Sequence, residues 1–305
     1  MPAPTQIRLD QLRRRKGADV FGQVFLLLLL TSVIVAFAMV GSVIWDVLVE
    51  AWDLISHDIW NFVSSASSSE ASKAGVAQGI RGTLMIAGIV ILTFPIGIGS
   101  AIYLEEYADD TRASRLIQVT VRNLAGVPSI VYGLLGLAVF AKSLGGLTGG
   151  SSVIAAGLTL AVLVLPVVVI TAAEAIRAVP SSLRDGAYGL GATQWEVVKT
   201  QVVPAALPSI LTGTVLAIAR ALGEAAPLLV IGAVGFYTTG NNDFVEQLQG
   251  AFTALPMNIA NFARLPADTW RGHAAAASLV LLALVFMINL VAIIARSRIS
   301  KRLGR

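Results

Sequence analysis

The chain has 305 residues, of which 56% are hydrophobic and only 13% charged, with 28 glycines and a formal net charge of +4. This composition excludes a soluble globular domain and indicates an all-α integral membrane protein. Cysteine is absent, which excludes a disulfide framework, a thiol nucleophile and Cys-type metal sites. His57 and His273 lie far apart at the edges of apolar segments, so we expect no metal site and no catalytic centre on this chain.

Six apolar segments are long enough to cross the hydrocarbon core of a bilayer, which takes about 20 residues of α-helix. The first segment is too long for a signal peptide and no small-residue cleavage site closes it, so we expect it to remain as an anchor. The expected spans are residues 20–49, 82–104, 116–141, 153–173, 207–236 and 274–295.

Basic residues concentrate on one side of these spans. They precede the first span, follow the last, and occur in the connections after the second and fourth. Cytoplasmic connections carry the excess of Lys and Arg, so both termini are expected to be cytoplasmic, and the net charge does not indicate nucleic-acid binding. The chain then divides into a basic segment 1–19, a first helix with outer loop 20–75, a transmembrane core 76–296 that contains a polar insert, and a basic tail 297–305.

Two outer connections have distinct compositions. The run Ser64 to Ser69 is expected to be a flexible exposed loop. The connection from Tyr237 to Arg271 is long and has an amphipathic stretch around Phe244 to Phe252. We expect this connection to lie on the membrane face or to cover a pathway.

A polar insert interrupts the apolar pattern at residues 179–207. Pro180 and the two serines after it signal a helix start, and about two turns can follow before Gly191 permits a reversal. Thr193 and Glu196 have the spacing of a capping box, which starts a second short helix. Pro204 and Pro208 are expected to separate that helix from the next span.

Large aromatic residues in the insert suggest what it does. If Trp195 and Tyr188 are exposed, they can fill a pocket on another protein, because aromatic side chains dominate interface energetics. The alternative is an ordinary amphipathic loop at the membrane surface. On composition alone both readings stay open.

Charged residues within or beside the spans are candidates for anion handling. Arg220 lies near the middle of the fifth expected span, with Glu224 four residues on and therefore on the same helical face. Arg177 and Glu174 repeat this pairing at the cytoplasmic end of the fourth span. A guanidinium can hold two oxygens of an oxyanion. A purely structural ion pair and a snorkelling arginine are the alternatives.

Two further features near the third span are weaker indications. Pro128 removes a helical hydrogen bond, so a break there either lines a cavity with Ser129 and Tyr132 or is a packing kink. A cluster of acidic residues precedes the span, beside arginines, and is expected to be a solvated, self-neutralising loop that can add a contact to a partner. The cluster comprises Glu105, Glu106, Asp109 and Asp110, with Arg112 and Arg115.

The insert resembles the EAA loop of ABC importer permeases, the coupling helix that docks on an ATPase subunit. The resemblance is carried by Asp185-Gly186-Ala187, Gly191 after three residues, and Pro204 after twelve more, with Trp195 where such loops often have an aromatic. Asp185, Gly186 and Gln201 depart from the residues usual in the family. The resemblance implies that these residues couple the chain to an ATPase.

Four other stretches resemble phosphate-specific permeases of the PstA type. They are LEEYADD at 104–110, NLAGVPSIVYGLLGLAVF at 123–140, LTLAVLVLPVVVITAAEAIRAVP at 158–180 and RALGEAAPLLVIGA at 220–233. The resemblance implies a type I ABC importer permease domain with six transmembrane helices and coupling helices between helices 4 and 5, in a prokaryotic plasma membrane. It also implies a transport role for Arg220 and Glu224.

The same resemblance implies partners. They are a homologous PstC-type permease, a dimer of a PstB-type ATPase that holds ATP-Mg, and a PstS-type phosphate-binding protein outside the membrane. The chain itself has no GxxxxGK[ST] loop, so we expect no nucleotide cofactor on it. Import of another oxyanion, such as sulfate or molybdate, and a channel or secondary transporter are the alternative functions.

Overall fold

The computed structural model describes residues 20–234 and 244–303, and every regular element among them is helical. The basic segment 1–19, the part of the last outer connection with Asn241, Asn242 and Asp243, and the last two residues lie outside the described residues. The chain divides into two units, Met1–Val49 and Glu50–Arg305. The described part of the first unit consists of the apolar beginning of helix α2, Val20–Ser64.

Among the described residues, five helical stretches are long and apolar enough to cross a membrane, and a sixth span is present if one sharply bent pair of helices counts as one. The five stretches are Phe21–Ser64, Ala77–Tyr107, Val153–Arg177, Gln194–Gly223 and Thr269–Arg298. The first therefore extends well past the expected end at residue 49, with one non-helical residue at Asp58. The last runs on as helix α15, Thr269–Leu303, into the expected basic tail.

The bent pair replaces the straight third span expected at residues 116–141. Its halves are Arg112–Ala125, which is helix α5, and Ser129–Ser143, which comprises α6 (Ser129–Gly136) and the π-helical η3 (Leu137–Ser143); they meet at 102°. Pro128 lies at the junction, where it lacks an amide donor and forces the preceding residue away from helical geometry. The expected break is thus confirmed. Tyr132 is buried, and its hydroxyl donates to the carbonyl of Leu124 over 2.8 Å, so this side chain packs in the core.

Helix α8, Val153–Arg177, is the centre of the second unit. It packs against α3 (Ala77–Ile91), α4 (Phe94–Ile102), α5, α6 and α11 (Val203–Gly223). Small residues allow the close approach: a Cβ on Gly136 of α6 would lie 2.0 Å from the hydroxyl of Thr159 on α8. Since this helix is apolar on all sides and buried on most, its side chains supply much of the core.

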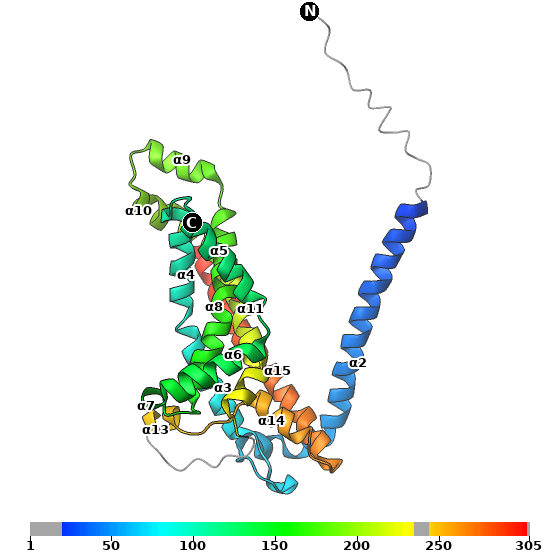
Figure 1. The fold of residues 1–305 in the computed structure, drawn as a ribbon. Helices are drawn as coiled ribbons and strands as arrows, with labels where there is room; N and C mark the ends of the chain where they lie inside the picture. The colour runs from blue at the N-terminus through cyan, green and yellow to red at the C-terminus, as the bar shows by residue number, and fades with distance from the viewer. Residues whose placement is uncertain (1–19, 235–243, 304–305) are drawn as a thin grey trace, which may run out of the picture. The chain divides into compact units, whose positions relative to one another are not determined.

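The polar insert lies at one end of this unit, and helices α7 (Gly145–Thr148), α13 (Phe244–Gln249) and α14 (Leu255–Phe262) lie at the opposite end (Figure 1). The C-terminal end of α15 is at the same end as the insert (Figure 1). The insert and the basic end of the last helix therefore lie on one side of the unit, as the distribution of charge predicts.

The serine run is not the freely exposed loop that its composition predicts. Ser67 is buried, its amide donates to Gln78 over 3.1 Å, and its hydroxyl accepts from Asn258 of α14 over 3.3 Å. Asn258 also accepts from Thr253 over 2.6 Å. Because buried polar groups need partners, these bonds hold the segment against α3 and α14. Helix α14 is likewise mostly buried, whereas α13 is exposed.

Helix α11 differs from the expected fifth span at both ends. It continues without a break from α10 (Gln194–Val197) through the π-helical turn η4 (Val198–Val202), so Pro204 and Pro208 do not separate the insert from the span. The amide of Val203 donates to the carbonyl of Val198, five residues back, and this wide turn accommodates the ring and missing donor of Pro204. At its other end α11 stops at Gly223, and a short helix α12, Ala226–Ile231, follows.

Candidate functional site

The insert forms two short helices joined by a tight reversal. Helix α9, Ser181–Gly189, ends before Gly191, whose φ of +85° lies in the left-handed region that glycine adopts without strain. Helix α10 begins at the expected capping box: the hydroxyl of Thr193 accepts from the amide of Glu196, whose carboxylate accepts from the amide of Thr193 over 2.8 Å. The helix starts and the reversal predicted from the sequence are confirmed.

One face of the insert is apolar and exposed, and the other packs against the core of the protein. Trp195 is 62% exposed, Tyr188 45% and Leu190 92%. On the inner side, Val197 and Val202 are fully buried in a cluster with residues of α4, α8 and α11. An exposed aromatic surface on a firmly anchored base is suited to docking another protein.

The remaining residues that the EAA resemblance singles out lie on the insert as follows. Asp185 and Gly186 are exposed on α9, and a Cβ on Gly186 would meet no atom within 4 Å. Ala187 is half-buried and packs against the anchoring cluster. Pro204 is the second residue of α11, directly after η4.

Arg184 of α9 joins the insert to two membrane helices. Its Nη2 donates to Oε1 of Glu106 over 2.8 Å and to the carbonyl of Ile176 over 3.0 Å, while its Nη1 donates to the carbonyl of Val179 over 2.8 Å. Glu106 belongs to η2, Tyr103–Tyr107, the π-helical end of the second span. The two side chains are only 22% and 8% exposed. We call this arrangement the Arg184 clamp.

A second bond strengthens the link between the insert and η2. The side-chain amide of Gln194, the first residue of α10, donates to the backbone carbonyl of Glu106 over 2.5 Å. Both short helices are therefore hydrogen-bonded to the same residue at the end of the second span. A displacement of the insert must move η2 with it or break both the charge-assisted bond from Arg184 and the amide bond from Gln194.

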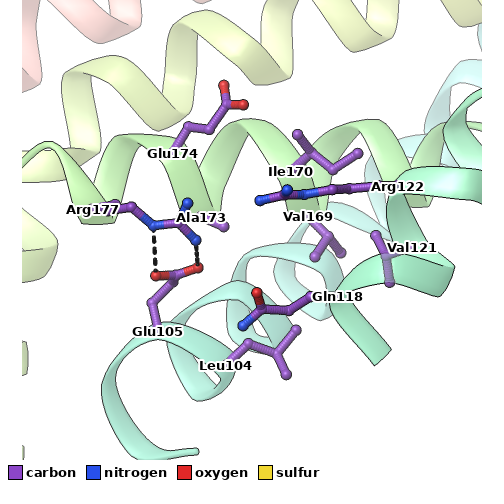
Figure 2. A pocket seen from close by; sticks show the side chains of 10 residues that line it. All are labelled: Leu104, Glu105, Gln118, Val121, Arg122, Val169, Ile170, Ala173, Glu174 and Arg177. Carbon is purple, nitrogen blue, oxygen red and sulfur yellow. Dashed lines mark hydrogen bonds and ion pairs between the residues drawn. The ribbon is translucent and has the colours of Figure 1, made fainter. Parts of the chain in front are cut away.

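Glu105, the neighbour of Glu106, binds the arginine that was expected to pair with Glu174. Its two carboxylate oxygens accept from Nε and Nη2 of Arg177 over 3.1 and 2.5 Å (Figure 2). Figure 2 shows the carboxylate of Glu174 directed away from this pair. The expected pairing of Arg177 with Glu174 is thus wrong, because the bent chain after α4 brings a carboxylate to the guanidinium in a bidentate geometry that an adjacent helical turn does not offer.

The acidic segment is only partly the solvated loop that was expected. Asp110 and Arg115 do form an exposed pair at 2.7 Å, and the hydrogen bond from Arg115 lowers the pKa of Asp110 below its ordinary value. Glu105 and Glu106, by contrast, are largely buried by their arginine partners. The segment therefore acts mainly as an internal connection to the insert.

Arg220 and Glu224 lie close together but not in the expected setting. Arg220 is in the last turn of α11 rather than in the middle of a span, and Glu224 has extended backbone angles just beyond the helix. Their closest charged atoms are 3.7 Å apart, and the side chains are 51% and 20% exposed. A loose, half-exposed pair leaves the guanidinium donors available to another anion.

The residues missed from the sequence are those that act across long separations. Arg184 and Gln194 of the insert bind Glu106, which was expected only as part of a solvated acidic loop, and Arg122 of α5, which pairs with no described residue, lines a pocket with Arg177. One signal was available in the sequence: carboxylates at the end of a membrane helix need cationic partners. Composition alone assigned these carboxylates to the arginines nearest in the chain.

Comparison with known proteins identifies one family and relatives along the whole chain. Residues 93–305 match the family described as "Binding-protein-dependent transport system inner membrane component". The chain is 34% identical over 301 residues, 98% of this chain and 95% of the relative, to the phosphate transport system permease protein PstA 1 of Mycobacterium tuberculosis. It is 30% identical over 298 residues, 90% of this chain and 89% of the relative, to the phosphate transport system permease protein PstC of Mesorhizobium japonicum.

Solved structures show the same fold. A chain in the crystal structure of a bacterial alginate ABC transporter, in complex with a periplasmic protein that binds alginate pentasaccharide, superimposes with a TM-score of 0.66. The match covers 92% of this chain and 96% of that one at 15% sequence identity. At this identity the likeness concerns the fold alone.

Proposed function

Because the chain belongs to the family of binding-protein-dependent transport system inner membrane components, we propose that it is a membrane permease subunit of an ATP-driven importer of inorganic phosphate. The observation that carries this proposal is the match to the permease PstA 1 over 98% of the chain. The resemblance found in the sequence and the type I importer fold are confirmed. The chain is a multi-pass membrane protein.

The proposal includes the partners that such an importer needs. They are a second, PstC-type permease, two copies of a PstB-type ATPase with bound ATP-Mg, and a PstS-type phosphate-binding protein at the outer face of a prokaryotic inner membrane. The likeness of the chain to a PstC permease supports a pair of related permeases. The missing phosphate-binding loop supports a separate ATPase.

In this proposal the insert couples the ATPase to the transport pathway. Trp195 and the surface around Asp185 dock on the ATPase, while Ala187 and the reversal at Gly191 hold their shape. Since α10, η4 and α11 form one continuous helix through Pro204, a displacement of the insert passes directly to the helix that carries Arg220. Alternating access then opens the pathway to each side in turn.

The proposed pathway residues are Arg220, Glu224, Arg177 and Glu174. Arg220 binds an oxyanion through two donors, and Glu224 neutralises it when the anion has left. The exposure of Arg220 and the 3.7 Å separation of the pair support this exchange.

Uptake of radiolabelled phosphate into proteoliposomes that contain the four-component complex tests the function. We expect ATP-dependent uptake that excess unlabelled phosphate abolishes and equal sulfate or molybdate leaves unchanged. Uptake that sulfate or molybdate suppresses would instead assign another oxyanion. Failure to co-purify with a separate ATPase would point to a channel or secondary transporter.

Replacing Gly191 with proline should uncouple ATP hydrolysis from uptake. Proline cannot adopt the observed φ of +85°, and it removes the amide that donates to the carbonyl of Tyr188 over 2.9 Å. The two losses cost about 2 kcal/mol or more in the native turn, so uptake per ATP should fall several-fold. The ratio of phosphate transported to ATP hydrolysed measures the effect. Gly88→Ala in α3 is the matched control: it lies outside the insert, its Cβ meets nothing within 4 Å, and coupling should be retained.

A further inference from the structure

A small pocket lies between α5, α8 and η2, close to the insert. Its polar lining consists of Gln118 and Arg122 from α5, Glu174 and Arg177 from α8, and Glu105 from η2. Figure 2 shows the guanidinium groups of Arg122 and Arg177 directed toward one another, with the amide of Gln118 on the same side of the pocket as Glu105. Three donor side chains therefore converge from two helices.

The two arginines differ in their partners. Arg177 is bound by Glu105 through two hydrogen bonds. Arg122 makes no hydrogen bond or ion pair with any residue that the structure describes, although its side chain lines the pocket. The carboxylate of Glu105 thus binds one of the two guanidinium groups that face the pocket.

The geometry of Glu105 on Arg177 is the geometry of a bound oxyanion. Two oxygens of a carboxylate or of a phosphate accept equally well from Nε and one Nη of a guanidinium. The pocket volume of about 30 Å³ is room for roughly two water molecules and not for a tetrahedral oxyanion as well. Any anion that enters must therefore displace the carboxylate of Glu105.

From this arrangement we propose that Arg122, Arg177 and Gln118 form an anion site for inorganic phosphate, and that Glu105 is a built-in competitor that fills the site in the present conformation. This inference rests on the proposed function for the identity of the anion. The site itself is inferred from two guanidinium groups that face the same pocket: that of Arg122, which pairs with no described residue, and that of Arg177, which the carboxylate of Glu105 binds.

The Arg184 clamp links this site to the insert. Glu105 is adjacent to Glu106, which is bonded to Arg184 of α9 and, through its carbonyl, to Gln194 of α10. When the ATPase displaces the insert, η2 moves with it and Glu105 is withdrawn from Arg177. The vacated site then accepts phosphate from the pathway, and the return of Glu105 expels it toward the cytoplasm. The hydrogen bonds of Glu106 with Arg184 and Gln194 therefore both transmit the displacement of the insert and drive the release of phosphate.

Equilibrium binding of radiolabelled phosphate to the purified complex, without ATP and without the phosphate-binding protein, tests the proposal. Glu105→Gln removes the competing charge and should increase phosphate affinity at least about tenfold, since a charge-assisted contact to Arg177 becomes available. Arg122→Gln in the Glu105→Gln background should reverse that gain. Arg115→Gln is the matched control, because it lies on the same helix, pairs with exposed Asp110 and does not line the pocket.

The outcomes separate this proposal from the function on which it rests. Unchanged phosphate affinity in Glu105→Gln, or a gain that Arg122→Gln leaves intact, overturns the site. If wild-type complex imports sulfate or molybdate instead of phosphate, the function is wrong, and the same binding series with the imported anion decides the site. Co-purification of all subunits is checked for each variant, and it shows that a loss of phosphate binding is not caused by a loss of assembly. Arg122→Gln should also reduce wild-type uptake at least several-fold.

Discussion

Arg184→Gln is expected to reduce phosphate uptake per ATP at least about tenfold and to lower the thermal stability of the complex. The substitution leaves Glu106 with a nearly buried, unpaired carboxylate. It removes four donated hydrogen bonds, two to Glu106 and two to the carbonyls of Ile176 and Val179, at and just beyond the end of α8. Breaking such a pair costs about 3 kcal/mol when both groups are buried, and about 2 kcal/mol is reasonable here because Arg184 is partly exposed. The insert is then tied to η2 only through the bond from Gln194 to the carbonyl of Glu106, and its movement is transmitted less tightly.

Two measurements check this expectation. The melting temperature of the complex should fall by several degrees, and uptake per ATP should fall at least about tenfold. Arg115→Gln is again the matched control: its ion pair is exposed on both sides, so the change in stability should be below about 1 kcal/mol. If Arg184→Gln retained wild-type coupling, the clamp would have no part in transmission.

A charge exchange sharpens the interpretation. In the double variant Arg184→Glu with Glu106→Arg, the ion pair can re-form, but glutamate accepts and cannot donate to the carbonyls of Ile176 and Val179. We therefore expect at most partial recovery of stability. Full recovery would show that charge pairing alone holds the insert and that the two carbonyl contacts contribute nothing.

The elements that follow local rules could be predicted from the sequence. The capping box at Thr193, the reversal at Gly191 and the break at Pro128 depend on residues within one or two turns, and all three are found. The end of α11 was missed because the apolar run continues past Gly223, and hydropathy alone does not report a helix end within it. The prolines of the insert were over-interpreted, since a π-helical turn accommodates Pro204.

The candidate site was only half predictable for a different reason. Arg177 was recognised as a cation near a helix end and Arg184 was not singled out, and the partners of both lie more than 70 residues earlier in the chain. Charge composition assigned Glu105 and Glu106 to nearby arginines, whereas the fold places Glu105 against Arg177 of α8 and Glu106 against Arg184 of the insert. Pairing over such a separation depends on how α4 packs on α8, which local sequence patterns do not specify.

Arg220→Gln is expected to leave the complex assembled and to abolish phosphate uptake. The pair with Glu224 is loose, at 3.7 Å, and Arg220 is half-exposed, so its loss should cost little stability. A bidentate, charge-assisted contact to phosphate would be lost, which corresponds to at least about a hundredfold decrease in uptake rate.

Glu224→Gln should act differently, since it keeps the guanidinium but removes the neutralising carboxylate. We expect slower release, seen as a lower maximal rate together with a lower half-saturating phosphate concentration.

Arg271→Gln provides the comparison for Arg220→Gln, because Arg271 also forms a loose pair, with Asp268 at 3.9 Å, and is 72% exposed. It lies in the first turn of α15, outside the proposed pathway, and its replacement should leave uptake within about twofold of wild type, as expected for an exposed pair. Wild-type uptake by Arg220→Gln would remove this arginine from the pathway. Equal losses in both variants would mean that basic charge near the outer connections, rather than a defined guanidinium, governs transport. A loss of phosphate uptake in Arg220→Gln but not in Arg271→Gln places the anion contact at the end of α11, the helix that continues from the insert.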